Sequence, residues 1–152
     1  MHNTIPIFGA FIAGFVLFAI VLWDAFEAII LPRRVTRKIR VTRLFYRTTW
    51  GIWKRFVNLF PARKSREALL GIYGPLSLLS LIVIWALGLV FSFALMQYGA
   101  GSSIHVTDGH PDFFTDLYFS GTTFFTLGLG DVSPHSTLSR ALLITEAGFG
   151  YG

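Results

Sequence analysis

Hydrophobic residues fill two long runs of the chain, and these runs predict two helices that cross a membrane. The first run, residues 5–31, has 27 residues, and the second, residues 71–98, contains no charged residue. At about 1.5 Å per residue the first run is roughly 40 Å long as a helix, and a hydrocarbon core is about 30 Å thick. A signal peptide is the weaker interpretation, because the positive charges follow this run and it is too long for such a peptide.

Two shorter apolar segments follow the second run, and neither is long enough to cross a bilayer. Residues 111–123 form a stretch of 13 residues that precedes a glycine-rich motif, so we expect a re-entrant helix here. Residues 138–152 would form only about 22 Å of helix. We therefore expect the chain to be a fragment or truncated product whose natural sequence continues beyond Gly152.

Composition and charge agree with a membrane protein and predict its orientation. The chain is 53% hydrophobic and 14% charged, with a mean hydropathy of +0.61. The net charge is +5, and 12 of the 13 Lys and Arg residues lie between Arg33 and Arg66, where no acidic residue occurs. The positive-inside rule then predicts that residues 33–70 are cytoplasmic and that the N-terminus lies outside. Because the chain has no cysteine, disulfides and thiolate metal sites are excluded.

The basic segment between the two runs predicts a helix that lies on the membrane surface. Over residues 36–60, aromatic and basic side chains alternate roughly with the helical period, which suits contact with the phosphates of anionic lipids. A nucleic-acid partner is disfavoured, because a short loop tethered to membrane helices at both ends is poorly placed to reach a nucleic acid. A third interpretation, in which the charges only orient the helices, stays open.

The motif TLGLGD directly follows the short apolar segment and carries the functional prediction. Glycine tolerates left-handed backbone conformations that other residues resist, so Gly128 and Gly130 would let consecutive carbonyl oxygens face one axis. Rings of such carbonyls replace the water shell of a cation in selectivity filters. Leu127 and Leu129 would project back into the protein, and Thr126 would add its carbonyl and hydroxyl oxygens. The alternative is a tight turn, since Gly-x-Gly alone is a weak signal.

Residues 71–152 resemble the pore region of the potassium channel superfamily, whose filter usually reads T-x-G-[YFL]-G-D. The resemblance implies an all-α membrane protein with two transmembrane helices, an interfacial basic helix, a re-entrant pore helix with its filter, and a truncated inner helix. One pore loop supplies a quarter of such a filter, so the expected unit is a homotetramer. No cofactor is expected besides K⁺ as the permeant ion, which would be bound by the backbone carbonyls of Thr126, Leu127, Gly128 and Leu129.

These expectations divide the chain into three parts: an N-terminal transmembrane helix (1–32), a cytoplasmic basic segment (33–70) and a pore domain that is incomplete at its C-terminus (71–152). The extra helix and short loops suggest a bacterial inner membrane. An enzyme is disfavoured, because no nucleophile, base and orienting group are clustered in the sequence. Two other functions stay open: a weakly selective cation channel, and a non-conducting regulatory or truncated subunit.

Four residues around the filter depart from the usual pattern or support it in a different way. Leu129 replaces the most frequent tyrosine, and Phe119 stands where tryptophan is common, so the contact between them would be apolar. Tyr118 keeps a hydroxyl that could reach Asp131 and brace the outer mouth. Thr122 stands where some relatives place a carboxylate behind the filter. These changes motivate the weakly selective alternative without removing the ladder of carbonyls.

Polar residues and glycines inside the apolar runs are further candidates. Gly148 and Gly150 lie where related channels often have a hinge glycine, although close packing against a neighbouring helix is an equal alternative. A carboxylate in a membrane helix is costly, so Glu146 is a functional candidate that would either line the cavity or anchor the pore helix from behind. Asp24 and Glu27 share a helix face near the cytoplasmic end and are expected to pair with the arginines that follow.

Overall fold

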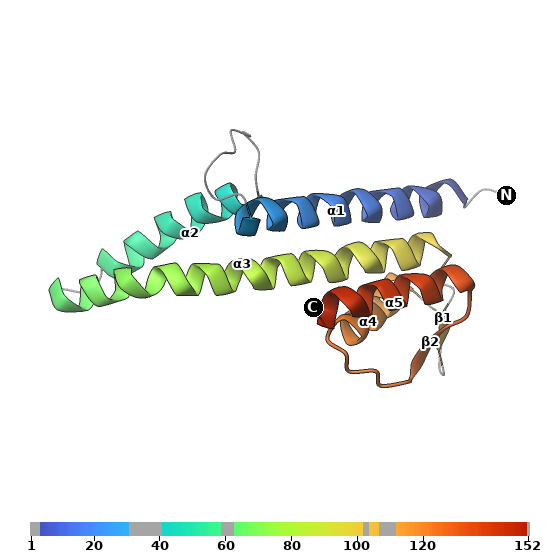
Figure 1. Ribbon diagram of the computed structural model, residues 1–152. Coiled ribbons are helices and arrows are strands. Elements are labelled where there is room, and N and C mark those ends of the chain that lie inside the picture. Colours follow the sequence, from blue (N-terminus) through green and yellow to red (C-terminus); the bar gives the residue numbers. More distant parts are fainter. Residues whose placement is uncertain (1–3, 31–40, 59–62, 102–103, 107–111, 152) are drawn as a thin grey trace. The chain divides into compact units, whose positions relative to one another are not determined.

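The computed structural model describes residues 4–30, 41–58, 63–101, 104–106 and 112–151. They form two compact units, of which the first comprises residues 1–21 and 86–152 and the second comprises residues 22–85. Helices α1 and α3 contribute residues to both units. The elements, shown in Figure 1, are α1 (Thr4–Ile30), α2 (Val41–Asn58), α3 (Arg63–Gly99), β1 (Ile104–Val106), α4 (Phe113–Phe124), β2 (Val132–Pro134) and α5 (Thr137–Tyr151).

The chain is predominantly helical, as the sequence predicted, and two of the described helices are long and apolar enough to cross a membrane. These candidate spans are Phe8–Ile29, with a mean hydropathy of 2.1, and Leu69–Gly99, with a mean hydropathy of 2.6. Helix α3 begins at Arg63, well before the apolar run that starts at Gly71. The helix extends into this charged stretch because Arg, Lys, Glu, Ala and Leu are good helix formers.

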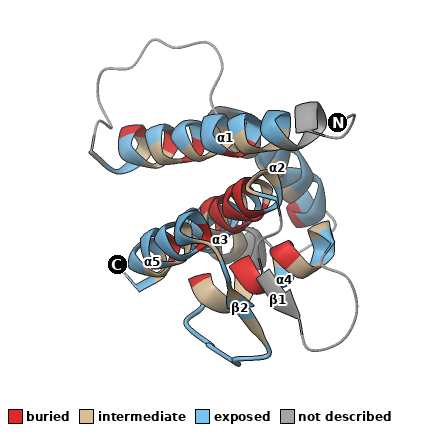
Figure 2. Ribbon diagram, turned by 90° about the vertical axis from the view of Figure 1, so that its right-hand side faces the viewer, coloured by how far each residue is buried: buried red, intermediate tan, exposed pale blue. Residues whose placement is uncertain are grey.

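In the first unit, α1 and α3 pack closely and antiparallel through glycines. A Cβ on Gly14 would lie 2.7 Å from the carbonyl oxygen of Ser92, and a Cβ on Gly99 would lie 2.3 Å from the backbone nitrogen of Phe11. Small residues of this kind let helix backbones approach each other within a membrane. Buried positions gather on α3 (Figure 2), where they include Leu89, Val90, Phe93, Ala94 and Met96.

Aromatic rings connect α1, α3 and α5 of the first unit. The ring of Phe18 meets the rings of Phe93 and Phe149 edge to face, with centroid separations of 5.3 Å in both cases. Edge-to-face pairs at this separation are a favourable arrangement of aromatic quadrupoles. Helix α5 is therefore anchored to the long helices as well as to α4.

A short two-stranded sheet, which the sequence did not predict, joins the two segments that flank α4 and the filter. Strands β1 and β2 pair antiparallel, with Ile104 opposite Pro134 and Val106 opposite Val132. Each strand has three residues, too few for an alternating pattern to be recognised in sequence. The sheet fixes the chain on the C-terminal side of the filter motif.

In the second unit, α2 packs antiparallel against the beginning of α3. The Thr49 and Tyr73 hydroxyls are 2.9 Å apart, and Trp53 Nε1 donates to the Leu69 carbonyl oxygen at 3.2 Å. These contacts occur in opposite order along the two helices. The structure thus describes as a helix the part Val41–Asn58 of the expected surface helix; residues 36–40 and 59–60 of that prediction lie outside the described residues.

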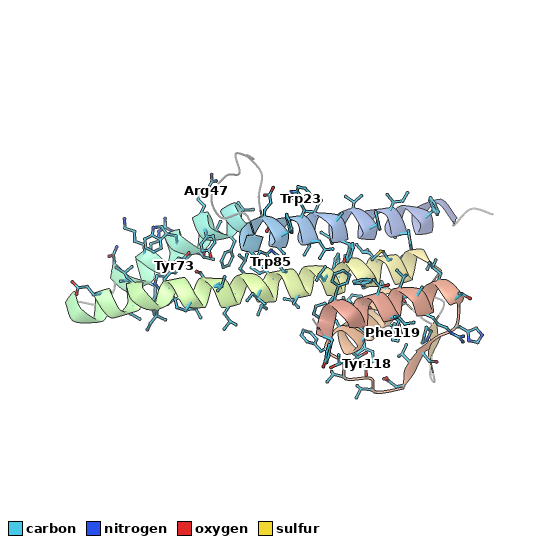
Figure 3. The ribbon with its side chains drawn as sticks, in the orientation of Figure 1. Trp23, Arg47, Tyr73, Trp85, Tyr118 and Phe119 are labelled. Atoms are coloured by element: carbon cyan, nitrogen blue, oxygen red, sulfur yellow. The ribbon has the colours of Figure 1, made fainter. Side chains whose placement is uncertain are left out.

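The two acidic residues of α1 are buried and accept hydrogen bonds from indole rings. Trp85 Nε1 donates to Asp24 Oδ2 at 3.0 Å, and Trp23 Nε1 donates to Glu27 Oε1 at 2.8 Å. Trp85, labelled in Figure 3, thus links α3 to α1 by a buried hydrogen bond. The arginines that were expected to pair with the two carboxylates lie outside the described residues, so that pairing stays a prediction.

Candidate ion-conducting site

The short helix α4 begins with a side-chain cap. Asp112 Oδ1 accepts hydrogen bonds from the Thr115 backbone N–H at 2.8 Å and from its hydroxyl at 2.7 Å, and the Asp112 backbone N–H points back to Thr115 Oγ1 at 3.4 Å. This reciprocal arrangement is a capping box, which satisfies amides that the helix leaves unpaired. The hydrogen bonds from Thr115 hold the pKa of Asp112 below its usual value. The helix therefore starts at Phe113, two residues later than the predicted stretch.

The TLGLGD motif directly follows the C-terminal cap of α4. After the cap residue Phe125, the Leu127 N–H donates to the Thr122 carbonyl at 2.8 Å and the Thr126 N–H donates to the Thr123 carbonyl at 3.0 Å. This pair of bonds defines a Schellman motif, in which the residue after the cap is left-handed and usually glycine. Here Thr126 occupies that position with φ of 56°.

Left-handed residues then recur at every second position of the motif. Thr126, Gly128 and Gly130 have φ values of 56°, 53° and 80°, whereas Leu127 and Leu129 do not have positive φ. Alternation between left- and right-handed residues turns successive amide N–H groups to one side of the chain, so we expect the carbonyls to turn to the other. Thr126 is the single described non-glycine residue with positive φ, a costly conformation that often marks functional sites.

Sequence reasoning anticipated the glycines but not the left-handed threonine. The signal was available in part, because Thr126 directly follows a short helix and so falls where a C-terminal helix cap is formed. The six residues of the TLGLGD motif, Thr126 to Asp131, are all exposed in the single chain. Leu127 and Leu129 are 61% and 62% exposed, so the packing predicted for them is not supplied by the described residues of this chain.

A hydrogen bond links α4 to the outer end of the filter motif. The Tyr118 hydroxyl donates to Asp131 Oδ2 at 2.8 Å, and Asp131 Oδ1 accepts from the Val132 N–H at 3.1 Å. The contact that the sequence suggested is thus present, and Figure 3 shows Tyr118 on the filter side of α4. The neighbouring Phe119 is buried, and the Thr122 hydroxyl donates to its carbonyl oxygen at 3.0 Å.

Helix α5 packs against α4 through residues four positions apart on both helices. The Ser120 hydroxyl is hydrogen-bonded to Glu146 Oε1, and a Cβ on Gly150 would lie 1.9 Å from the carbonyl oxygen of Phe124. Of the two candidate hinge glycines, Gly150 is therefore at a close backbone contact. A Cβ on Gly148 would meet no atom within 4 Å.

The beginning of α5 is fixed by a buried amide that sequence reasoning missed. Gln97 Nε2 donates to the Ser139 carbonyl at 3.2 Å, and the Ser139 hydroxyl donates to Gln97 Oε1 at 2.6 Å. Ser136 caps the helix, because its Oγ accepts from the Ser139 N–H at 3.0 Å. Gln97 and Ser139 are fully buried. The available signal was an amide at the end of a long apolar run, where a buried polar group needs partners.

The two apolar spans, the short capped helix and the left-handed motif together define an integral membrane protein of the channel type. A family model described as an ion channel matches residues 77–152, which is half of the chain. The chain therefore belongs to this ion-channel family, and its established class is a membrane channel and not an enzyme. No curated protein and no solved structure matches the chain.

Proposed function

We propose that the chain is a subunit of a potassium-selective channel in which residues 126–130 form one quarter of the selectivity filter. The observation that carries this proposal is the recurrence of positive φ at Thr126, Gly128 and Gly130 immediately after a short capped helix. Such a backbone would offer a row of carbonyl oxygens on one side, which is what a dehydrated cation requires. K⁺ would bind to the carbonyls of residues 126–129 and step between them by mutual repulsion.

A homotetramer is the assembly that this proposal requires. A single row of carbonyls cannot surround an ion, whereas four related rows around an axis form closed rings. The exposure of Leu127 and Leu129 fits this arrangement, because neighbouring subunits would then cover them. The C-terminal ends of four α4 helices would also point their partial negative charges toward the ion.

The proposed location is the plasma membrane of a bacterium, with the N-terminus outside and residues 33–70 in the cytoplasm. Helix α2 supports contact with anionic lipid, because Arg47, Lys54 and Arg55 are exposed on it and its sequence contains no acidic residue. A groove of about 200 Å³ is lined mainly by apolar and aromatic side chains of α2 and α3, among them Phe45, Ile52, Trp53, Tyr73 and Leu76. Acyl chains would occupy this groove while the basic residues contact phosphates.

The proposal is tested by ion flux into liposomes that contain the full-length gene product. Gly128→Ala should abolish K⁺-selective flux, because a Cβ at φ of 53° disfavours the left-handed conformation by about 1–2 kcal/mol in every subunit. Gly101→Ala is the matched control, since Gly101 also has positive φ, at 91°, with open space around its added Cβ, but lies outside the filter. Gly101→Ala should conduct like the parent.

The outcomes separate the filter hypothesis from a general loss of structure. If Gly128→Ala conducts K⁺ as well as the parent, the motif is not the filter. If a properly assembled parent conducts no ion, the channel proposal fails and a regulatory role becomes the better hypothesis.

A weakly selective cation channel is the second candidate, motivated by Leu129. This residue lacks the hydroxyl that the usual tyrosine directs to its surroundings, and its side chain makes no hydrogen bond that could stiffen the filter. Reversal potentials in mixed Na⁺ and K⁺ distinguish the two candidates. A shift toward the K⁺ equilibrium potential supports potassium selectivity, and a value near zero supports the alternative.

A further inference from the structure

Behind the pore helix, one buried hydroxyl joins three helices. Ser120 of α4 has its Oγ 3.1 Å from the carbonyl oxygen of Val90 on α3, and the same atom is hydrogen-bonded to Glu146 Oε1 on α5. Ser120 and Glu146 are both fully buried. The filter begins at Thr126, less than two turns beyond Ser120, so this cluster lies where it can hold the end of α4 in place.

The number of hydrogen-bond donors in this cluster indicates that Glu146 is uncharged. A serine hydroxyl has one proton to donate and can accept other hydrogen bonds. It cannot fully donate to both the Val90 carbonyl and an ionised carboxylate. If Glu146 carries a proton, the carboxyl donates to Ser120 Oγ and the Ser120 hydroxyl donates to the Val90 carbonyl, so that both contacts are complete hydrogen bonds.

The surroundings of Glu146 also disfavour a charged carboxylate. Glu146 Oε2 is buried and has no hydrogen-bond partner among the described residues, and an ionised carboxylate with so few donors is costly to bury. The described parts of α1 and α3 in the first unit contain no charged residue. On α4 the titratable groups are Asp116, which is buried and has an interaction of its own, and Tyr118, whose hydroxyl donates to Asp131. On α5, Arg140 is exposed and directs its Nε–H to the Pro134 carbonyl.

We propose that Glu146 is a neutral positioning residue of the filter, which donates a hydrogen bond to Ser120 and so fixes the pore helix between α3 and α5. This inference rests on the proposed channel function. Gly150 supports it, because its close contact with Phe124 holds the next turn of α4 on the same face of α5. Ionisation of Glu146 at alkaline pH would remove the donated proton and introduce a buried charge, and the end of α4 would be displaced.

The test compares three variants of the full-length gene product in liposomes by K⁺ flux, by K⁺ over Na⁺ selectivity and by the pH dependence of both. Glu146→Gln should keep the selectivity of the parent, because its amide N–H can donate to Ser120 in place of the carboxyl. Glu146→Ala should lower the selectivity ratio by about tenfold, which is the scale of one lost buried hydrogen bond. Thr145→Val is the matched control, since Thr145 is the exposed neighbour on α5, and it should behave like the parent.

The pH profile distinguishes a neutral positioning residue from a merely structural one. Flux through the parent should fall when the pH is raised far enough to ionise Glu146. Flux through Glu146→Gln should stay constant over the same pH range. The inference is overturned if Glu146→Gln loses selectivity as Glu146→Ala does, or if the parent and Glu146→Gln share the same pH profile. The parent measurement still decides the matter if Glu146→Ala does not assemble. A parent that assembles but conducts no ion would instead refute the channel function itself.

Discussion

Replacing Gly150 by alanine tests the close approach of α5 to the end of the pore helix. A Cβ on Gly150 would lie 1.9 Å from the carbonyl oxygen of Phe124. Because Cβ atoms essentially never come within 3.0 Å of another atom, the added methyl group must push the backbones of α4 and α5 apart. Overpacking of this kind costs about 1–3 kcal/mol, and in the proposed tetramer the cost arises in every subunit.

Gly148→Ala is the matched control, because it adds the same methyl group to the same helix two residues earlier. Its Cβ would meet no atom within 4 Å, and alanine is favoured over glycine inside a helix by about 0.5–1 kcal/mol. The assay is thermal unfolding of the purified protein in detergent together with K⁺ flux. Each kcal/mol should change the Tm by about 2–4 °C, so Gly150→Ala should unfold earlier and conduct less, while Gly148→Ala should unfold no earlier than the parent.

Equal stability and flux of Gly150→Ala and the parent would refute the packing argument. The hinge prediction would be supported if Gly148→Ala unfolds no earlier than the parent but loses flux, because a hinge is needed for opening and not for folding. The two variants therefore distinguish a role in close packing from a role in gating, which the sequence alone could not do for Gly148 and Gly150.

Two further predictions concern the link between α4 and Asp131 and the N-terminal cap of α4. Tyr118→Phe and Asp131→Ala should each reduce K⁺ over Na⁺ selectivity, and the double variant should be no worse than Asp131→Ala alone, because both changes remove the same 2.8 Å hydrogen bond; additive losses of selectivity would contradict this. The capping contribution of Asp112 should be present above its unfolded pKa of 3.8 and be lost as the pH falls through its lowered folded value. Thermal unfolding between pH 2 and 6 should therefore show a smaller acid loss of stability in Asp112→Ala than in the parent.

The helices α1, α3 and α4 could be predicted from the sequence because each depends on a local property of the chain. Long apolar runs predicted α1 and α3, and the short run before the glycines predicted α4 to within two residues. The early start of α3 at Arg63 could not be predicted from hydropathy, because helix propensity and not burial extends it. The pairing of β1 with β2 depends on contacts between segments that are far apart in sequence, and each strand is too short to leave a pattern.

The sequence predicted which residues form the candidate site, but not which buried residues hold that site in place. Gly128 and Gly130 are recognisable because glycine spacing has a direct conformational meaning. The role of Ser120 is not recognisable, since an isolated serine in an apolar helix has no distinctive signal until Val90 and Glu146 are brought beside it. Glu146 was recognisable as a costly carboxylate in an apolar segment, and its hydrogen bond to Ser120 of α4 supports the proposal that it anchors this helix.

In the proposed channel, the geometry of the filter depends on how the end of α4 is held, and this predicts effects on selectivity. Thr126 is the left-handed residue of the helix cap and the first residue of the proposed filter, so a displacement of the helix end would be passed directly to the first carbonyls. Carbonyl rings discriminate between ions through their geometry and number. Changes at Ser120 or Gly150 should therefore alter selectivity although neither residue lies in the filter, whereas exposed changes on α2 should not.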